Sequence, residues 1–169
     1  MRRRGASLTH DRNGAAAAEM ALVLPILLVL MFGSLEIGNY FMNQHTLVKA
    51  VRDGARFAAR KPFAGYTACS GSPDATVVSE TQNVVMRGYS SGGTIITPNI
   101  DAADVSVTTS CETMAGTQTM SGIYAGRTTG AQIVRVSARV NYRPVLGIMG
   151  FTGIGLHLNA ASEAAVAGL

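Results

Sequence analysis

The sequence has 169 residues, of which 47% are hydrophobic and 14% are charged, and its formal net charge is +4. This length is enough for about one domain. The apolar residues are concentrated in residues 20–35, which contain no charged side chain. The remainder is polar and rich in Gly, Ser and Thr, so it can bury only a modest core. The high share of hydrophobic residues and the low share of charged ones argue against an ordinary soluble domain.

The basic residues form two clusters, one on each side of the apolar block. Basic runs commonly indicate nucleic-acid binding. Here no aromatic residues are interleaved with the cations, no known reader motif is present, and the apolar block separates the clusters. We therefore expect no nucleic-acid partner. The first cluster is Arg2, Arg3, Arg4 and Arg12, and the second is Lys49, Arg52, Arg56, Arg60 and Lys61.

The apolar block is long enough to cross a membrane as a helix. At about 1.5 Å per residue, residues 15–37 cover about 34 Å, and a hydrocarbon core is about 30 Å thick. A core helix of a soluble domain would show a polar face, which residues 20–35 lack. A cleaved secretory signal would need a small-x-small site after the block, and residues 33–38, GSLEIG, fit that poorly. Pro25 is tolerated in a membrane helix and predicts a kink.

Helical periodicity continues beyond the apolar block. A stripe of apolar residues follows one face as far as residue 60, and Gly38 and Gly54 cost a helix about 1 kcal/mol each. The sequence therefore predicts one helix from about Ala15 to Arg60, ended by Lys61-Pro62. A helix that served as an anchor alone would not need this extension, so we expect the stripe to pack against other helices. The stripe contains Ile37, Phe41, Val48, Val51 and Ala55.

The charge distribution predicts the topology. The Arg residues before the apolar block favour a cytoplasmic N-terminus. The far flank is also basic, but its first cation, Lys49, lies well beyond the span. We therefore expect three parts: a basic leader at residues 1–14, a transmembrane and projecting helix at residues 15–61, and an exported domain at residues 62–169.

The exported part is predicted to be a small α+β domain with three antiparallel strands and one helix over one face. Asp74 is the expected N-cap of the helix. The order of the strands does not follow from the sequence. The expected helix is Ala75–Arg87, and the expected strands are Asp104–Ser110, Ala131–Tyr142 and Leu156–Ala167.

Two cysteines, Cys69 and Cys111, follow the apolar block. Neither belongs to a CxxC pair, so a zinc site is not expected. If the domain is exported to an oxidising compartment, the two cysteines should form one disulfide. The alternative is two unrelated buried thiols.

No constellation of catalytic residues is recognisable. His10, His45 and His157 are scattered without the spacing of a metal site, and no nucleophile elbow, HExxH or phosphate-loop motif is present. We therefore expect no catalytic residues, no metal and no cofactor, and we do not expect an enzyme.

The order of features at the N-terminus carries the functional prediction. An Arg-rich leader is followed by Gly14, Ala15, Glu19 and the apolar span. A glycine before the cut leaves no side chain to collide with a peptidase, and a cut after Gly14 would make Ala15 the new N-terminus. Placing the charged Glu19 side chain at the edge of the membrane is unfavourable. The free-energy cost there is smaller than the roughly 3 kcal/mol for a charge at the membrane centre. The amine of a neighbouring subunit would offset that cost. Alternatively, Glu19 is a solvated interfacial residue and Gly14 a flexible joint.

Gly14 followed by Glu19 and a long apolar helix resembles the class III signal of type IV prepilins. Three longer stretches resemble the TadE-like family of pseudopilins, which belong to the tight-adherence (Flp) pilus machinery; weaker similarity continues at residues 140–147 and 156–167. Met20 stands where the family often has an aromatic residue. The three stretches are GAAAAEMALVLP at residues 14–25, GSLEIG at 33–38 and VRDGARFAAR at 51–60.

The resemblance implies a pseudopilin of the bacterial inner membrane, with its C-terminal domain in the periplasm. The implied partners are the membrane, a prepilin peptidase, and other pilus assembly proteins or pilin subunits, including further copies of the chain. Glu36, at the far end of the span, either marks the interface or contacts a basic residue of a partner helix. The alternative function is a membrane-tethered periplasmic binding or scaffold module that does not enter a pilus.

Overall fold

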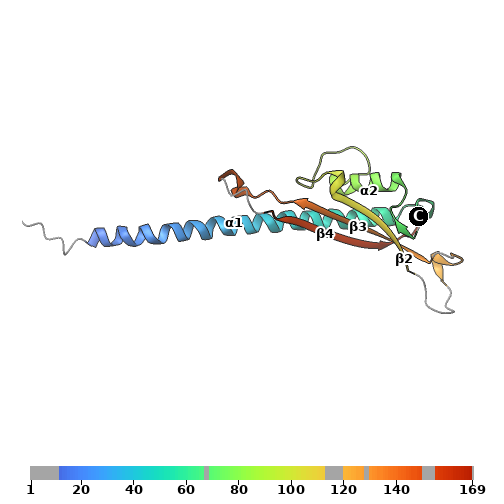
Figure 1. The fold of residues 1–169 in the computed structure, drawn as a ribbon, viewed down its shortest axis with the longest axis horizontal. Helices are drawn as coiled ribbons and strands as arrows, with labels where there is room; N and C mark the ends of the chain where they lie inside the picture. Colours follow the sequence, from blue (N-terminus) through green and yellow to red (C-terminus); the bar gives the residue numbers. More distant parts are fainter. Residues whose placement is uncertain (1–11, 67–68, 113–119, 128–129, 150–154, 169) are drawn as a thin grey trace, which may run out of the picture. The chain divides into compact units, whose positions relative to one another are not determined.

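The computed structural model describes residues 12–66, 69–112, 120–127, 130–149 and 155–168. The chain divides into two units between Gly38 and Asn39, and each is described by itself. The predicted α+β class is confirmed (Figure 1). The helices are α1 (Arg12–Ala59) and α2 (Ala75–Arg87), and the strands are β1 (Ser70–Gly71), β2 (Val105–Glu112), β3 (Ala131–Asn141) and β4 (His157–Ala165).

The four strands form one antiparallel sheet in the order β1-β2-β3-β4. The sequence predicted three of them, with ends within two residues of those observed. It missed β1, because a strand of two residues is too short to show the alternation that identifies a strand. The prediction of three strands is therefore corrected to four.

The core lies between the sheet and the second half of α1. Along β3, Val134, Val136 and Val140 are buried, while Arg135 and Arg139 on the other face are exposed, as the alternation predicted. The side chains of α1 that pack on the buried face are Leu47, Ala50, Val51, Ala55, Ala58 and Ala59. Full burial of a Leu or Val side chain contributes about 1.5–3 kcal/mol, so this layer is a main source of the stability of residues 39–168.

The ends of α2 agree with the prediction, but the capping differs. Asp74 occupies the N-cap position without a side-chain hydrogen bond, and its carbonyl accepts the N–H of Val78 at 3.0 Å. At the other end Gly88 has φ 77°, and its N–H donates to the Val84 carbonyl at 2.8 Å. Glycine adopts this left-handed conformation without strain and so ends the helix.

Gly54 is the point of close approach between α1 and α2. A Cβ atom built on Gly54 would lie 2.5 Å from Cγ2 of Val85 and 3.7 Å from Cγ2 of Thr81. Both of these α2 side chains are fully buried. A side chain at position 54 would therefore push α2 away from α1, which explains why a glycine is suited to the interior of this helix despite its low helix propensity.

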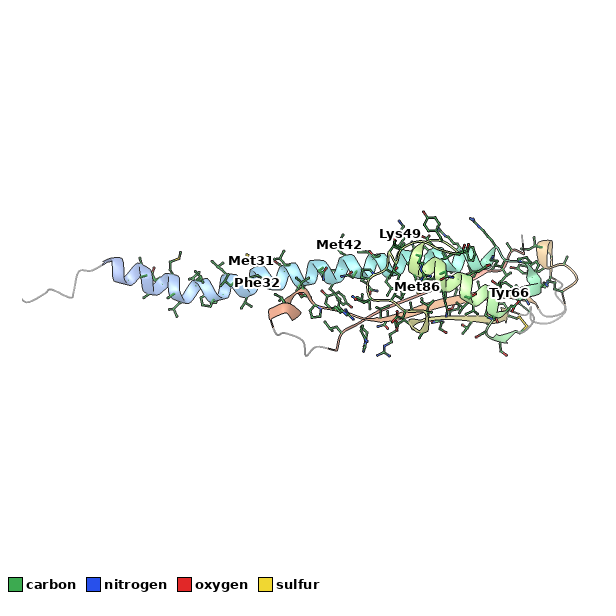
Figure 2. All side chains as sticks on the ribbon, turned by 90° about the horizontal axis from the view of Figure 1, so that it is seen from above. Met31, Phe32, Met42, Lys49, Tyr66 and Met86 are labelled. Carbon is green, nitrogen blue, oxygen red and sulfur yellow. A yellow bond between two sulfur atoms is a disulfide. The ribbon has the colours of Figure 1, made fainter. Side chains whose placement is uncertain are left out.

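Tyr66 connects the end of α1 to the sheet (Figure 2). Its hydroxyl donates to the Ala58 carbonyl at 2.5 Å, in the last turn of α1, where carbonyls lack partners within the helix. Its own carbonyl accepts from the side-chain amide of Gln132 on β3. Burial raises the pKa of Tyr66 to about 12, so the hydroxyl keeps its proton to a higher pH than an exposed tyrosine does.

Candidate functional site

The residues around the expected cut lie in the first turns of α1. Gly14 and Ala15 are helical and exposed, whereas a peptidase that cuts after Gly14 would have to bind these residues in an extended conformation. A Cβ atom built on Gly14 would meet nothing within 4 Å, and its backbone does not require positive φ. The described fold therefore gives no packing reason for a glycine at this position.

Glu19 is exposed one turn after Ala15 on the same helix. Neither of the two ion pairs between described side chains involves Glu19. Glu36, at the other end of the apolar block, is half-buried.

The apolar block between these two acids is exposed except at Phe32 and Gly33, which are half-buried. Figure 2 labels Met31, which is 49% exposed, and Leu22 and Val29 exceed 70%. The helix containing this block has a stretch with a mean hydropathy of 2.4, none of it buried inside the described protein. Pro25 lies inside the helix without ending it. By length and composition, this helix can cross a membrane.

The predicted helix-packing stripe is buried at one end and exposed at the other. Its interpretation as one surface for other helices is therefore corrected. Val51 and Ala55 are buried in the core of the chain's own domain, and Val48 is half-buried. Ile37 and Phe41 are 59% and 55% exposed. The reason is that the sheet supplies an apolar face of the same chain, to which the second half of α1 packs.

Cys69 and Cys111 form a disulfide, as predicted, with a Cα–Cα distance of 4.9 Å. The bridge lies next to the pairing of β1 with β2, in which Ser70 is opposite Ser110. Cys69 is exposed and Cys111 is half-buried. The bridge therefore holds a very short strand against the sheet at a place where little apolar surface is buried.

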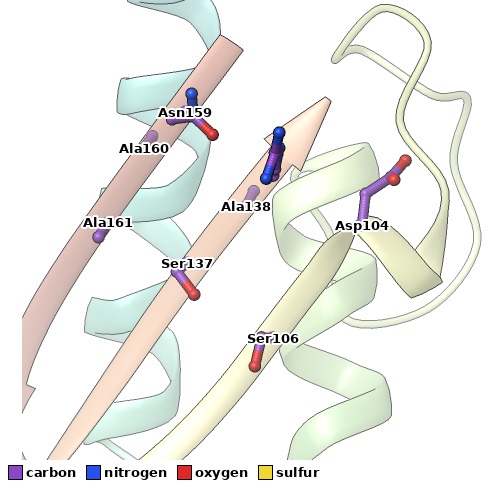
Figure 3. A pocket seen from close by; sticks show the side chains of 8 residues that line it. Asp104, Ser106, Ser137, Ala138, Asn159, Ala160 and Ala161 are labelled. Carbon is purple, nitrogen blue, oxygen red and sulfur yellow. The ribbon is translucent and has the colours of Figure 1, made fainter. Parts of the chain in front are cut away.

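The outer face of the sheet carries an open hollow of about 410 Å³ (Figure 3). Ser106, Ser137 and Asn159 lie on neighbouring strands along it, with Asp104 at one end. The sequence does not predict that these residues lie together, because their proximity depends on the strand order. No group of three or more His, Cys, Asp or Glu among the described residues could hold a metal ion.

A second hollow of about 410 Å³ lies beside α1, where α2 ends. Ala50, Val84 and Ile96 contribute its apolar wall, and Lys49 and Asp53 of α1 line it as well. Ile96 is 55% exposed. The hollow could not be predicted from the sequence, because it depends on where the segment after α2 lies relative to α1.

Comparison with known proteins identifies the N-terminal part of the chain. Residues 14–56 match the TadE family, described as TadE-like protein, which confirms the resemblance found in the sequence. The match contains Gly14, Ala15, Glu19, the apolar block and Gly54, and it does not extend over the sheet. It indicates a protein associated with the Tad pilus. No curated protein and no solved structure gives a significant match.

Proposed function

We propose that this chain, which carries a TadE-like segment at residues 14–56, is a membrane-anchored pseudopilin that contributes to the assembly or structure of a tight-adherence pilus. The observation that carries the proposal is the exposed apolar first half of α1 with Gly14 and Glu19 directly before it. An apolar helix exposed on all sides is covered by lipid before assembly and by other helices after it.

Processing after Gly14 by a prepilin peptidase is the first step of this function. The described fold does not need glycine at position 14, since a side chain there would meet nothing. A peptidase whose active site has no space for a side chain before the cut would need glycine at this position. The helical state of residues 12–15 means that the first turn must open for cleavage, which costs little because helix ends fray easily.

The proposed topology places residues 1–14 in the cytoplasm and the domain after the span in the periplasm of a bacterial inner membrane. Its support is the basic leader, the uncharged block and the disulfide, which an oxidising compartment maintains. A reporter inserted at Gly93, in an exposed loop, should show the activity of an exported fusion. A reporter placed before residue 12 should show cytoplasmic activity, and the reverse pair of results would contradict the topology.

Glu19 is proposed to pair with the new N-terminal amine of a neighbouring subunit. A positive amine at a helix N-terminus is disfavoured by the helix dipole, and a carboxylate nearby offsets this effect. In assembly, subunits shifted along their helices would bring the amine of one against Glu19 of the next.

Glu19→Gln should therefore insert into the membrane normally but yield few pili, counted by electron microscopy, since the amine of the neighbour loses its anionic partner. The control variant Glu112→Gln, which changes an exposed carboxylate at the end of β2, should assemble normally. Normal piliation with Gln at position 19 would remove the role of this charge and favour the alternative, a tethered binding module that uses α1 as an anchor alone.

A further inference from the structure

The outward face of α1 in the second unit carries a row of cations. Lys49, Arg52 and Arg56 follow one another at the spacing i, i+3 and i+7, which places them on one helix face, and Arg60 lies in the turn directly after the helix. All four are exposed, and Figure 2 shows the Lys49 side chain pointing outward from α1. Neither of the two ion pairs between described side chains involves them. The helical part of the row, from Lys49 to Arg56, extends for about 10 Å.

The hollow beside α1 begins where this row begins. Lys49 belongs to both, and the wall formed by Ala50, Val84 and Ile96 lies next to it. Exposed apolar side chains continue from this wall, since Ile95 is 53% exposed and Tyr89 68%. A cationic row and an apolar hollow thus form one continuous surface on residues 39–168.

The charges on this surface distinguish between kinds of anionic partner. Asp53 is exposed within the cationic row, one turn after Lys49. A uniform polyanion, such as a surface of anionic lipid headgroups, would offer this carboxylate no cationic partner. A protein helix can place a cation opposite Asp53 and carboxylates opposite the Arg residues, whose guanidinium groups bind carboxylates in two-pronged geometry.

We propose that this surface docks an acidic amphipathic helix of another protein, with its carboxylates along Arg52, Arg56 and Arg60 and one apolar side chain in the hollow beside Lys49. Recognition of a helix through apolar anchors at helical spacing is a common mode of peptide binding, and complementary charges set its orientation. A second copy of the chain is a poorer occupant, because neither α1 nor α2 carries a row of carboxylates: α2 contains one, Glu80, and those of α1, Glu19, Glu36 and Asp53, are far apart along the helix. The inference adds the chemistry of a partner to the proposed function and does not depend on it.

The test uses the full chain in detergent micelles and labelled helical peptides as probes. The first peptide carries four Glu residues at i, i+3, i+7 and i+11, a Lys opposite Asp53 and a Leu for the hollow. It should bind, and binding should weaken as salt is raised, because the charges are exposed. A peptide with Lys in place of the four Glu residues should bind at least about tenfold more weakly, since like charges then face each other.

Variants of the chain locate the binding surface. Arg56→Glu and Ile96→Ser should each weaken binding of the first peptide several-fold, and both positions are exposed, so the fold should persist, as checked by circular dichroism. Arg139→Glu, which reverses an exposed cation on the outer face of the sheet, is the matched control and should leave binding unchanged. Equal weakening by Arg139→Glu would overturn the proposal.

Vesicles containing phosphatidylglycerol separate a protein partner from a lipid surface. Asp53→Asn should weaken binding of the peptide with Lys opposite position 53, because that Lys loses its partner. If the chain instead binds the vesicles, binds them better after Asp53→Asn and ignores the peptide, the surface recognises lipid and the proposal is wrong.

Discussion

Replacement of Gly14 with phenylalanine is expected to leave the chain at its full length, with residues 1–14 still attached. The reason is steric, since a peptidase that accepts glycine before the cut has no space for an aromatic ring. The fold should be unaffected, because nothing lies within 4 Å of a Cβ atom at position 14. The precursor and the processed chain differ enough in mass to be separated on a gel of isolated membranes.

The matched control is Gly33→Phe, a second glycine of α1 at which an added Cβ atom would also meet nothing within 4 Å. This variant should be processed as completely as the original chain, because position 33 lies far from the cut. If Gly14→Phe were processed normally, glycine would not be required before the cut. If both variants remained full-length, the effect would arise from the added bulk in the helix and not from the cleavage site.

Removal of the disulfide is expected to lower the free energy of unfolding by about 4 kcal/mol, estimated from chain entropy for a loop that joins cysteines 42 residues apart. Cys69 is exposed and Cys111 half-buried, so little of this loss comes from buried side-chain surface. The substitution Cys69→Ser with Cys111→Ser should therefore produce a large fall in the midpoint of chemical unfolding. β1 should separate first, because two residue pairs hold it to β2.

Reduction of the unmodified chain is the control for this prediction. It should lower stability by the same amount as the double substitution and should have no further effect on the double variant. Equal stability of the bridged and unbridged chains would show that the bridge adds nothing to the packing of β1 on β2. Labelling of the denatured, unreduced chain should find no reactive thiol at positions 69 and 111.

Helix boundaries and the three longer strands were predictable because each shows its periodicity over eight or more residues. α2 matches residue for residue, and α1 ends at Ala59, next to the predicted Arg60. The part of α1 before Ala15 was assigned to the leader, yet the helix already begins at Arg12. The role of Gly54 was also missed, because a close helix contact depends on where α2 lies.

The N-terminal residues of the candidate site could be predicted from the sequence, whereas the packing surfaces of α1 could not. Gly14, Ala15, Glu19 and the span are recognised by their order along the chain, which needs no knowledge of the fold. An apolar stripe on a helix does not reveal whether it packs on its own sheet or on a partner. Val51 and Ala55 proved to be core residues for this reason. The hollow beside Lys49 combines residues from three separate segments and leaves no pattern in the sequence.

The mature N-terminus tests the central claim most directly. The chain would be isolated from membranes of cells with an active prepilin peptidase, and its intact mass and N-terminal peptide determined by mass spectrometry. We expect the chain to begin at Ala15, with Glu19 as its fifth residue. A chain that still begins at Met1 in such cells would contradict its assignment as a processed pseudopilin.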